Sequence, residues 1–457
     1  MNKEYIIRVT KSICPVCLEH LEAFVLVNNG QVFLSKECPK HGKFKICLSK
    51  TAQLYEDLEK FYFAVMGIEQ KQADCEIWTT YRCNMDCPIC ILGTKESKER
   101  QMIELTVAHI EQFIKTNKYS LYTLSGAEAT CNKNTIEIIK ILKKHRKNVV
   151  LNTNGIKLAD GGYVRLLKTA GLDRVAVQFD GFKRQAGERF RGVDVLDTKL
   201  KALENLKNMQ IKTTLIATIA KHINEDDVSK LIDFALKNDF ISGVGFTSIS
   251  FGGGARDWNL NNYLMPDEII DLVEKKTGGK IAKRNVYLFQ KFIFAFKSFF
   301  SQRCCLYNQA YLLVRNGDKF SSISEFLNFE LANFWLNKYQ KLYGKSKIAS
   351  AGCLAMASIC LILKKKSILV INNLILSGFS YLLKTAHYLS ESRFVFLSFS
   401  TTCDPYKIDY SIVRNCQLEI MRGDRMSGKI ENAGREGLYC IELEKQHLKE
   451  KKEDLVA

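Results

Sequence analysis

The sequence predicts an α/β protein whose centre is a partial, TIM-like (β/α)6 barrel, with a small metal-binding domain before it and a mostly helical region after it. Strand-like and helix-like runs alternate six times between Asp74 and about Thr247, which is typical of a parallel barrel. Paired cysteine motifs precede this region, and apolar helical patterns follow it. We therefore expect a knuckle domain at 1–60, a barrel core at 61–262 and an α-rich C-terminal domain at 263–457.

The N-terminal region contains two short ligand motifs, Cys14-Pro-Val-Cys17 and Cys38-Pro-Lys-His41. Residues 23–27 and 31–34 form a hairpin-like pair around Asn28-Asn29-Gly30. The hairpin would bring the two motifs together, so they predict a tetrahedral site for Zn or a mononuclear Fe in a zinc-ribbon-like or rubredoxin-like domain. Four protein ligands would close the site, which favours a structural role. The alternative is a set of free buried thiols.

The barrel prediction rests on two interleaved sets of segments. The strand-like runs are 76–80, 121–124, 149–152, 174–179, 213–219 and 243–247. The helix-like runs, with apolar residues at i, i+3 and i+4, are 106–114, 135–144, 163–169, 200–209 and 227–237. In such a barrel the active-site loops follow the carboxyl ends of the strands.

Three cysteines directly follow the first of these strands, as Cys83-Asn-Met-Asp-Cys87-Pro-Ile-Cys90. Three thiolates on one tight loop can hold three irons of a 4Fe-4S cluster and leave the fourth iron open. A structural zinc knuckle is the alternative, but zinc needs a fourth ligand, and the loop offers none nearby in the sequence.

Polar residues also follow the next three strands, in the segments Ser125-Gly126-Ala127-Glu128, Asn152-Thr-Asn-Gly155 and Gln178-Phe-Asp180-Gly181. The Asn152–Gly155 segment is as compatible with a plain turn as with a role in ligand binding. The Gln178–Gly181 segment is as compatible with a helix N-cap at Asp180 as with a role in ligand binding. After the sixth strand, the Gly252-Gly-Gly-Ala-Arg256 loop is either a substrate lid or a simple connector.

The C-x3-C-x2-C spacing and the order of these motifs resemble the radical SAM superfamily. The resemblance implies that Cys83, Cys87 and Cys90 hold the 4Fe-4S cluster and that its open iron binds S-adenosylmethionine. One electron from an external ferredoxin- or flavodoxin-type reductant then gives a 5'-deoxyadenosyl radical. Ser125, Gly126 and Glu128 stand where the superfamily has its G-G-E-P motif, with Ala127 and Ala129 as departures. Together with Asn152 and Gln178, they are the expected cofactor-binding residues, and no catalytic residue is assigned.

Most of the chain resembles a narrower radical SAM branch that includes archaeal tetraether-lipid synthases and pterin methyltransferase-like enzymes. The shared features are the paired knuckles, the barrel motifs, an apolar helical insert at 326–392 and a late D-P-Y-x-x-D segment, Asp404 to Asp409, before Cys416. The resemblance implies an auxiliary iron–sulfur cluster on Cys304, Cys305, Cys403 and Cys416. Cys440 is the only cysteine after Cys416, so a final cysteine motif of the branch is missing. The alternative for these four cysteines is that they are thiols buried in apolar surroundings. We expect such a packing role for Cys47, Cys75, Cys131, Cys353 and Cys360.

Composition places further bounds on function. The chain has a net charge of +18 and 16 cysteines, but no RNA-recognition motif, so we expect no nucleic-acid partner. Its beginning lacks a secretory pattern, which favours a cytoplasmic protein with metal or redox cysteines over disulfides. The longest uncharged run, 348–363, is shorter than the ~20 residues of a membrane span. The apolar insert could instead lie on a membrane or pack against the barrel.

The expected function is hydrogen abstraction from an unactivated carbon of a lipid-like or other small-molecule substrate, followed by C–C bond formation. Three alternatives stay open. They are methyl transfer to a pterin-like heterocycle, maturation of a peptide, and a noncatalytic iron–sulfur protein.

Overall fold

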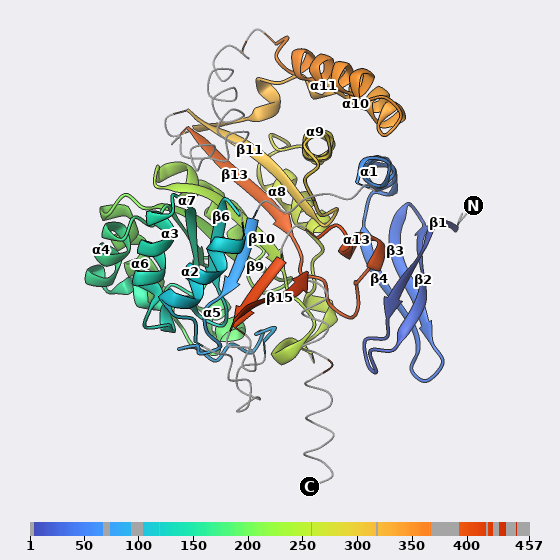
Figure 1. Ribbon diagram of the computed structural model, residues 1–457. Coiled ribbons are helices and arrows are strands. Elements are labelled where there is room, and N and C mark those ends of the chain that lie inside the picture. Colours follow the sequence, from blue (N-terminus) through green and yellow to red (C-terminus); the bar gives the residue numbers. More distant parts are fainter. Residues whose placement is uncertain are drawn as a thin grey trace.

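The computed structural model of this chain describes residues 4–66, 74–92, 104–117, 119–256, 258–316, 319–364, 366, 393–416, 419–423, 429–435 and 445. Parts of the predicted insert at 326–392 and of the tail, including Cys440, lie outside the described residues. Two sheets organise the described chain, one of four strands and one of eleven (Figure 1). No described helix is both long and apolar enough to cross a membrane.

The N-terminal domain is a four-stranded antiparallel sheet in chain order. Its strands are β1 Tyr5–Ile13, β2 His20–Asn28, β3 Gln31–Cys38 and β4 Gly42–Ser49. The predicted hairpin is therefore present and longer than expected. Asn29 and Gly30 both have positive φ, at 51° and 74°, which is the backbone of a two-residue hairpin turn. Helix α1, Ala52–Val65, follows this sheet.

The core of the molecule contains the six predicted parallel strands, each paired with the next along the chain. They are β5 Asp74–Trp78, β6 Leu121–Ser125, β7 Asn148–Thr153, β8 Arg174–Gln178, β9 Lys212–Ile219 and β10 Ile241–Ser248. The predicted helices are present as α2 Val107–Thr116, α3 Thr135–Lys144, α4 Gly161–Thr169, α6 Leu196–Asn208 and α7 Asp227–Lys237. The α/β fold class predicted from the alternation is confirmed. The structure adds one helix that the pattern did not indicate, α5 Arg184–Arg191.

Alternate residues of the core strands point to opposite faces of the curved sheet. Tyr122, Leu124, Val149 and Leu151 are buried in the main apolar core, on the face that the helices cover in Figure 1. Trp78, Ser125, Asn152 and Gln178 have the other parity, so they belong to the inner face of the sheet. This parity places the predicted polar residues on one concave surface.

The region after residue 262 contributes both helices and strands. Its helices are α8 Pro266–Lys276, α9 Lys283–Phe299, α10 Phe329–Leu342, α11 Lys347–Leu361 and α13 Tyr410–Val413. Its strands are β11 Asn308–Asn316, β12 Lys319–Ser322, β13 Phe394–Ser400, β14 Glu419–Gly423 and β15 Ile430–Arg435. Strand β13 pairs in parallel with β10, and β14 pairs in parallel with β5. The C-terminal region thus extends the core sheet at both ends, in addition to the helices that the sequence predicted.

The late D-P-Y-x-x-D segment joins the N-terminal sheet to the core. Asp409 accepts hydrogen bonds from Arg8 Nη2 at 2.7 Å and from Thr10 Oγ1 at 2.6 Å. At the other end of the segment, Asp404 accepts from the Phe251 backbone N–H at 3.0 Å and from Lys407 Nζ at 2.5 Å. The segment is therefore a clamp between the two sheets.

Candidate functional site: a three-cysteine loop at the mouth of the barrel

The three-cysteine loop follows β5 at the carboxyl end of the parallel strands. Its second half is a tight turn in which the Cys90 N–H donates to the Cys87 carbonyl at 3.0 Å. Cys83 Sγ accepts from the Met85 N–H at 3.4 Å and from Asn154 Nδ2 at 3.8 Å. All three thiols are partly exposed rather than sealed in the core. The loop can therefore present its sulfurs to a common ligand at the strand ends.

The triple-glycine loop that follows β10 lies directly against the cysteine loop. The Gly254 N–H donates to the Cys90 carbonyl at 2.9 Å. A Cβ on Gly254 would lie 2.7 Å from the Pro88 carbonyl oxygen, which is too close for any side chain. From the sequence, this loop was either a substrate lid or a simple connector. In the structure it packs against one side of the cysteine loop.

The Ser125–Glu128 segment lies along the residues that precede Cys83. The Ala127 N–H donates to the Thr80 carbonyl, and the Glu128 N–H donates to the Arg82 carbonyl, each at 3.1 Å. Gly126 has φ of 125°, and a Cβ there would lie 2.4 Å from the Thr80 oxygen. Only glycine allows this approach, because both the conformation and the contact exclude a side chain.

Glu128 is buried and connects the ends of β6 and β7. Its Oε1 accepts from Thr130 Oγ1 and Thr153 Oγ1 at 2.7 Å each, and its Oε2 accepts from the Asn154 N–H at 2.6 Å. Because both carboxylate oxygens are engaged within the protein, Glu128 can shape a cofactor pocket by holding these loops. That Glu128 belongs to a cofactor pocket stays a prediction.

The other predicted cofactor residues line the same edge. Asn152 Nδ2 donates to Ser125 Oγ at 3.4 Å, and the Asn152 side chain is exposed. The Gln178 side chain is held at both ends, since its amide nitrogen donates to Asp180 and its amide oxygen accepts from Lys199 Nζ at 2.5 Å. The structure therefore brings Ser125, Asn152 and Gln178 to one edge of the sheet. That these residues bind a cofactor stays a prediction.

Asp180 pairs with Arg191 at the end of α5. Arg191 Nε and Nη2 each donate to one Asp180 oxygen at 2.8 Å, and the Thr218 N–H donates to Asp180 Oδ1 at 3.0 Å. The N-cap alternative for Asp180 is wrong, because the residue that caps α5 is Lys183. Burial lowers the pKa of Arg191, but attraction to Asp180 outweighs it and raises that pKa above its usual range.

The Arg191 charge also acts on the Cys87 thiol. Burial raises the pKa of Cys87, and the Arg191 charge opposes that rise. A guanidinium in this position favours the thiolate, which is the form that binds metal. The sequence motifs missed this residue, because Arg191 lies on a short helix and reaches Cys87 only through the fold.

Lys199 of α6 is a further site residue that the motifs missed. It is buried, and its Nζ donates to the Gln178 carbonyl at 2.8 Å and to the Asn154 carbonyl. Burial, followed by the nearby Arg191 charge, lowers the pKa of Lys199 to about 7. The signal in the sequence was a lysine at a core position of an amphipathic helix.

The second candidate centre is in the N-terminal sheet, where the four predicted ligands come together. The ligand atoms of Cys14, Cys17, Cys38 and His41 all lie within 4.8 Å of one another. The Cys38 Sγ–His41 Nδ1 distance is 3.4 Å, and the Cys17 Sγ–Cys38 Sγ distance is 3.9 Å. Three sulfurs and one imidazole nitrogen in a compact group fit a tetrahedral Zn²⁺.

The remaining candidate ligands, Cys304, Cys305, Cys403 and Cys416, do not form such a compact group among the described residues. Cys304 accepts from Gln290 Nε2 at 3.9 Å inside the apolar core, and its carbonyl accepts from Tyr62 OH at 3.2 Å. The auxiliary cluster on these four cysteines stays a prediction. Cys75, Cys353 and Cys360 are buried in the main core, as expected of packing residues.

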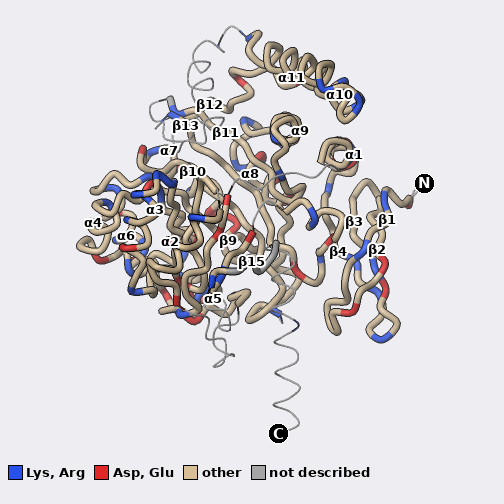
Figure 2. Tube along the Cα trace, viewed as in Figure 1, with Lys and Arg blue, Asp and Glu red and all other residues tan. Residues whose placement is uncertain are grey.

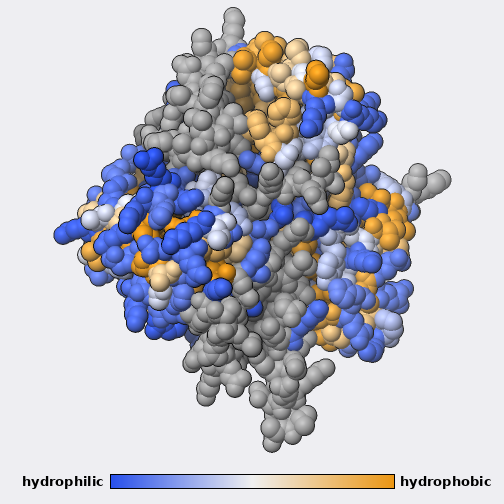
Figure 3. All heavy atoms as spheres, viewed as in Figure 1, coloured by the Kyte–Doolittle hydropathy of each residue, from blue (hydrophilic) through white to orange (hydrophobic). Residues whose placement is uncertain are grey.

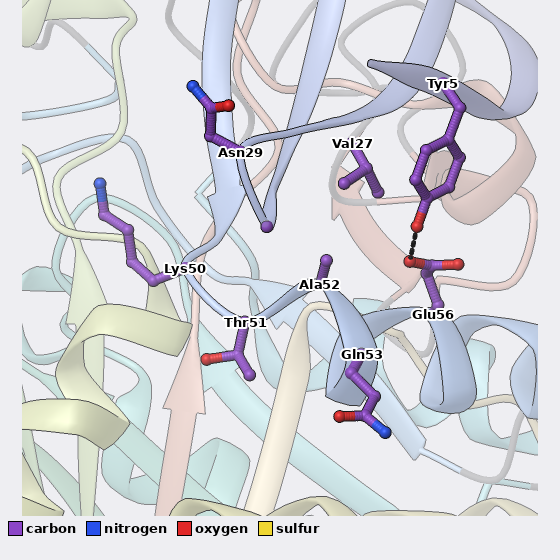
Figure 4. A pocket seen from close by; sticks show the side chains of 9 residues that line it. Tyr5, Val27, Asn29, Lys50, Thr51, Ala52, Gln53 and Glu56 are labelled. Atoms are coloured by element: carbon purple, nitrogen blue, oxygen red, sulfur yellow. Dashed lines mark hydrogen bonds between the residues drawn. The ribbon is translucent and has the colours of Figure 1, made fainter. Parts of the chain in front are cut away.

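A shallow surface pocket of about 700 Å³ lies elsewhere, between the β2–β3 turn and the start of α1 (Figure 4). The Tyr5 hydroxyl donates to Glu56 across it at 2.6 Å. Its lining contains none of the predicted site residues, so it does not mark the barrel site.

The parallel core, the C-x3-C-x2-C loop and the G-x-E loop lie in the part of the chain that matches a known family model. Residues 77–235 match the family described as "Radical SAM superfamily", and residues 6–50 match the "HMPTM N-terminal zinc ribbon domain". The chain therefore contains a region that is similar to the radical SAM superfamily, and this region follows one that is similar to a zinc ribbon domain.

Among curated proteins, the chain is similar to a 7,8-dihydro-6-hydroxymethylpterin dimethyltransferase of Methanocaldococcus jannaschii. The two are 30% identical over 308 residues, which is 61% of this chain and 60% of that protein. A probable GTP 3',8-cyclase of Pyrococcus abyssi is 30% identical over 35% of this chain and 51% of its own length. The chain thus spans between half and two thirds of these relatives. Among solved structures, SuiB of Streptococcus suis bound to the precursor peptide SuiA has a TM-score of 0.40 and 16% identity, over 51% of each chain.

Proposed function

We propose that this chain is a radical SAM methyltransferase acting on a pterin-like heterocycle. The observation that carries the proposal is the 308-residue likeness to a pterin dimethyltransferase, together with a zinc ribbon of the HMPTM type in the same chain. Methyl transfer to a pterin-like heterocycle was one of the alternatives from the sequence. We favour it here over the expected lipid-like substrate.

The inner face of the sheet supports a polar substrate. Toward the strand ends it bears Ser125, Asn152 and Gln178, and deeper in the sheet it bears Glu76. Burial raises the pKa of Glu76, and hydrogen bonds from Trp78 and Ser125 oppose that rise. A polar wall of hydroxyl, amide and carboxyl groups can supply donors and acceptors to a heterocycle, whereas an alkyl chain has no polar atoms to pair with them.

The cluster site fits the cofactor that the superfamily implies. Cys83, Cys87 and Cys90 would hold a 4Fe-4S cluster, which supplies the electron that cleaves S-adenosylmethionine. The chain's own part is positional. Glu128 holds the pocket loops together, Arg191 favours the Cys87 thiolate, and the triple-glycine loop shields the cysteine turn from one side.

The test is incubation of anaerobically reconstituted protein with a reductant, 7,8-dihydro-6-hydroxymethylpterin and S-adenosylmethionine that carries a deuterated methyl group. We expect a pterin product that contains the labelled methyl, together with 5'-deoxyadenosine, and neither product from the Cys83→Ala/Cys87→Ala/Cys90→Ala protein. Formation of 5'-deoxyadenosine without any methylated pterin would overturn the substrate assignment. Absence of S-adenosylmethionine cleavage under all these conditions would instead favour a noncatalytic iron–sulfur protein.

A lipid-like substrate is the second candidate. It is favoured by the apolar outer surface of α10 and α11, which is described below. C–C coupled lipid in the same assay, supplied with total lipid extract in place of the pterin, would identify it.

A further inference from the structure

Helix α11 is apolar on all sides but lies at the outside of the molecule. Its inner face, which includes Cys353, Leu354, Ala357 and Cys360, is buried against the rest of the chain. Its outer face, continued just beyond the helix end, carries Ile348, Met356, Ile359 and Leu363. The exposed fraction is 88% for Ile348 and 62% for Leu363. A helix that is apolar all round is normally covered on every side.

The neighbouring helix α10 widens this surface. The two helices lie side by side as a hairpin, and the Asn328 N–H donates to the Leu361 carbonyl at 2.9 Å where α10 begins and α11 ends. Leu331 and Phe334 of α10 are also exposed, Phe334 by 55%. Figure 3 shows hydrophobic atoms gathered over α10 and α11 with hydrophilic atoms at their border. We call Leu331, Phe334, Ile348, Met356, Ile359 and Leu363 the apolar patch.

The border of the apolar patch is basic. Lys338, Lys341, Lys345 and Lys347 are exposed, and none forms an ion pair with a described residue. Figure 2 shows Lys and Arg at the end of α10 that adjoins α11. Lys338 Nζ lies 4.5 Å from the Phe334 ring centre and 4.6 Å from that of Trp335, so its ammonium group lies over aromatic rings at the edge of the apolar patch. The sequence has no Asp or Glu between Glu330 and Glu391.

We propose that the α10–α11 hairpin docks on the surface of an anionic phospholipid bilayer, with the apolar patch in the interface and the four lysines at the headgroups. The chemistry that supports this partner is the combination of exposed apolar and aromatic side chains with unopposed lysines. Helix α11 has 15 residues, a length of about 22 Å, which is too short to cross a hydrocarbon core of ~30 Å. The hairpin would therefore lie in the plane of the bilayer surface.

Charge argues against the two other occupants. A second copy that packed this face against itself would bring two lysine borders together, which is repulsive in an isologous contact. The segment 367–392 of this chain has no acidic residue before Glu391, so it offers little to pair with the lysines. An anionic bilayer can cover the apolar patch in its interface and also pair its charged headgroups with the lysines of the border.

The test is co-sedimentation of the full chain with vesicles of equal parts phosphatidylglycerol and phosphatidylcholine, compared with pure phosphatidylcholine vesicles. We expect binding to the anionic vesicles, weakened by salt and at least tenfold weaker on the neutral ones. In the Lys338→Gln/Lys341→Gln/Lys345→Gln/Lys347→Gln protein each lost charge should weaken binding roughly fivefold. The Ile348→Ser/Ile359→Ser/Leu363→Ser protein should lose at least tenfold.

Matched controls lie on the opposite part of the molecule. Leu166→Ser/Val193→Ser removes exposed apolar residues of the barrel region, and Lys140→Gln/Lys144→Gln/Lys168→Gln/Lys207→Gln removes four exposed lysines of α3, α4 and α6. Both should bind as the wild type does. Circular dichroism and urea unfolding confirm that each variant is folded.

A second readout does not depend on affinity. The Trp335 ring centre lies 5.5 Å from that of Phe334 in the apolar patch, so brominated acyl chains should quench part of the tryptophan fluorescence, and Trp335→Phe should abolish this quenching. Failure of the wild type to bind anionic vesicles would overturn the proposal, as would equal losses in the control variants. A stable wild-type dimer that the serine variant dissociates would identify a second copy as the occupant. None of these results depends on methyl transfer, so the outcome is separable from that of the proposed function.

Discussion

Glu128 is the residue whose contacts most directly explain how the strand ends are held at the site. One carboxylate joins Thr130 on its own loop to Thr153 and Asn154 on the next. Hydrogen bonds to charged groups each contribute about 1.5–3 kcal/mol. Loss of a single oxygen here should therefore be measurable in both stability and cofactor binding.

Glu128→Gln should lower the free energy of unfolding by about 1–3 kcal/mol, because an amide leaves at least one N–H donor without an acceptor. S-adenosylmethionine should also bind more weakly to the reconstituted protein. Urea denaturation and isothermal titration calorimetry measure the two effects. The matched control is Glu137→Gln on α3, whose exposed pair with Lys140 contributes little. Equal stability of the two variants would contradict the role given to Glu128.

Lys199 predicts a specific dependence of stability on pH. Burial lowers its pKa to about 7 in the folded protein, whereas an unfolded lysine titrates near ~10.4. Between these values the unfolded chain binds more protons, so the contribution of Lys199 to stability should increase as pH rises from about 7 toward 10. Below about pH 7 the group is charged in both states and its contribution is constant.

The measurement compares the urea-unfolding free energies of wild type and Lys199→Met at about pH 6.5 and about pH 9. The advantage of the wild type over the variant should be larger at the higher pH, because methionine does not titrate. A difference in unfolding free energy that stays constant or shrinks with pH would mean that burial does not lower the pKa of Lys199.

At the residue scale, the sequence predicted what lies within a few positions and missed what the fold brings together. The three-cysteine loop and the paired knuckles are local motifs, so their ligand chemistry could be inferred from spacing and residue type alone. Arg191 and Lys199 reach the site from α5 and α6, and no spacing connects them to Cys87 or Gln178. Their roles depend on the packing of helices against strand ends, which a single sequence does not encode locally.

At the scale of elements, the clamp between the zinc ribbon and the core is the feature with the clearest consequence. Asp409 pairs with Arg8 and Thr10 of β1 and also accepts from the Ser411 N–H at the start of α13 at 2.9 Å. Its side chain is fully buried. Without the Asp409 charge, Arg8 would keep only its ion pair with Glu59, at 2.8 Å.

Asp409→Asn should therefore cost about 1.5–3 kcal/mol of unfolding free energy, because it weakens the charged hydrogen bonds to Arg8 and Thr10, and it should make the ribbon more susceptible to limited proteolysis while the zinc content stays unchanged. Asp226→Asn is the control, since Asp226 pairs with Lys183 and Lys276 at the exposed surface. If the ribbon of Asp409→Asn stayed as protected as that of the wild type, the segment would not be a clamp.

The elements differ in how well their patterns predicted them. The six core strands were predictable because they are apolar runs that alternate with amphipathic helices. Within the predicted α-rich region, helices α8 and α9 are separated where Gly278 and Gly279 adopt positive φ and end α8. Helix α5, Arg-Gln-Ala-Gly-Glu-Arg-Phe-Arg, buries only Ala186 and Phe190, which is too few apolar positions to give a helical period.

At the scale of the whole molecule, the C-terminal region is part of the core sheet. Strands β13 and β14 extend the sheet at its two ends, so a boundary near residue 262 marks a change of pattern without a break in the sheet. Pairing between strands hundreds of residues apart is non-local and could not be inferred from periodicity. The outcome is one continuous sheet that carries the cysteine loop after β5, the ribbon on one side and the α10–α11 hairpin at its outer end.

The central claim is that Cys83, Cys87 and Cys90 hold a cluster whose open iron binds S-adenosylmethionine. The most direct measurement is iron and sulfide analysis with EPR spectroscopy of the anaerobically reconstituted protein and of its Cys83→Ala/Cys87→Ala/Cys90→Ala variant, before and after S-adenosylmethionine is added. We predict that about four irons are lost in the variant, that zinc in the ribbon is retained, and that the wild-type EPR signal shifts when S-adenosylmethionine binds. Equal iron contents in the two proteins, or a wild-type signal that ignores S-adenosylmethionine, would contradict the account.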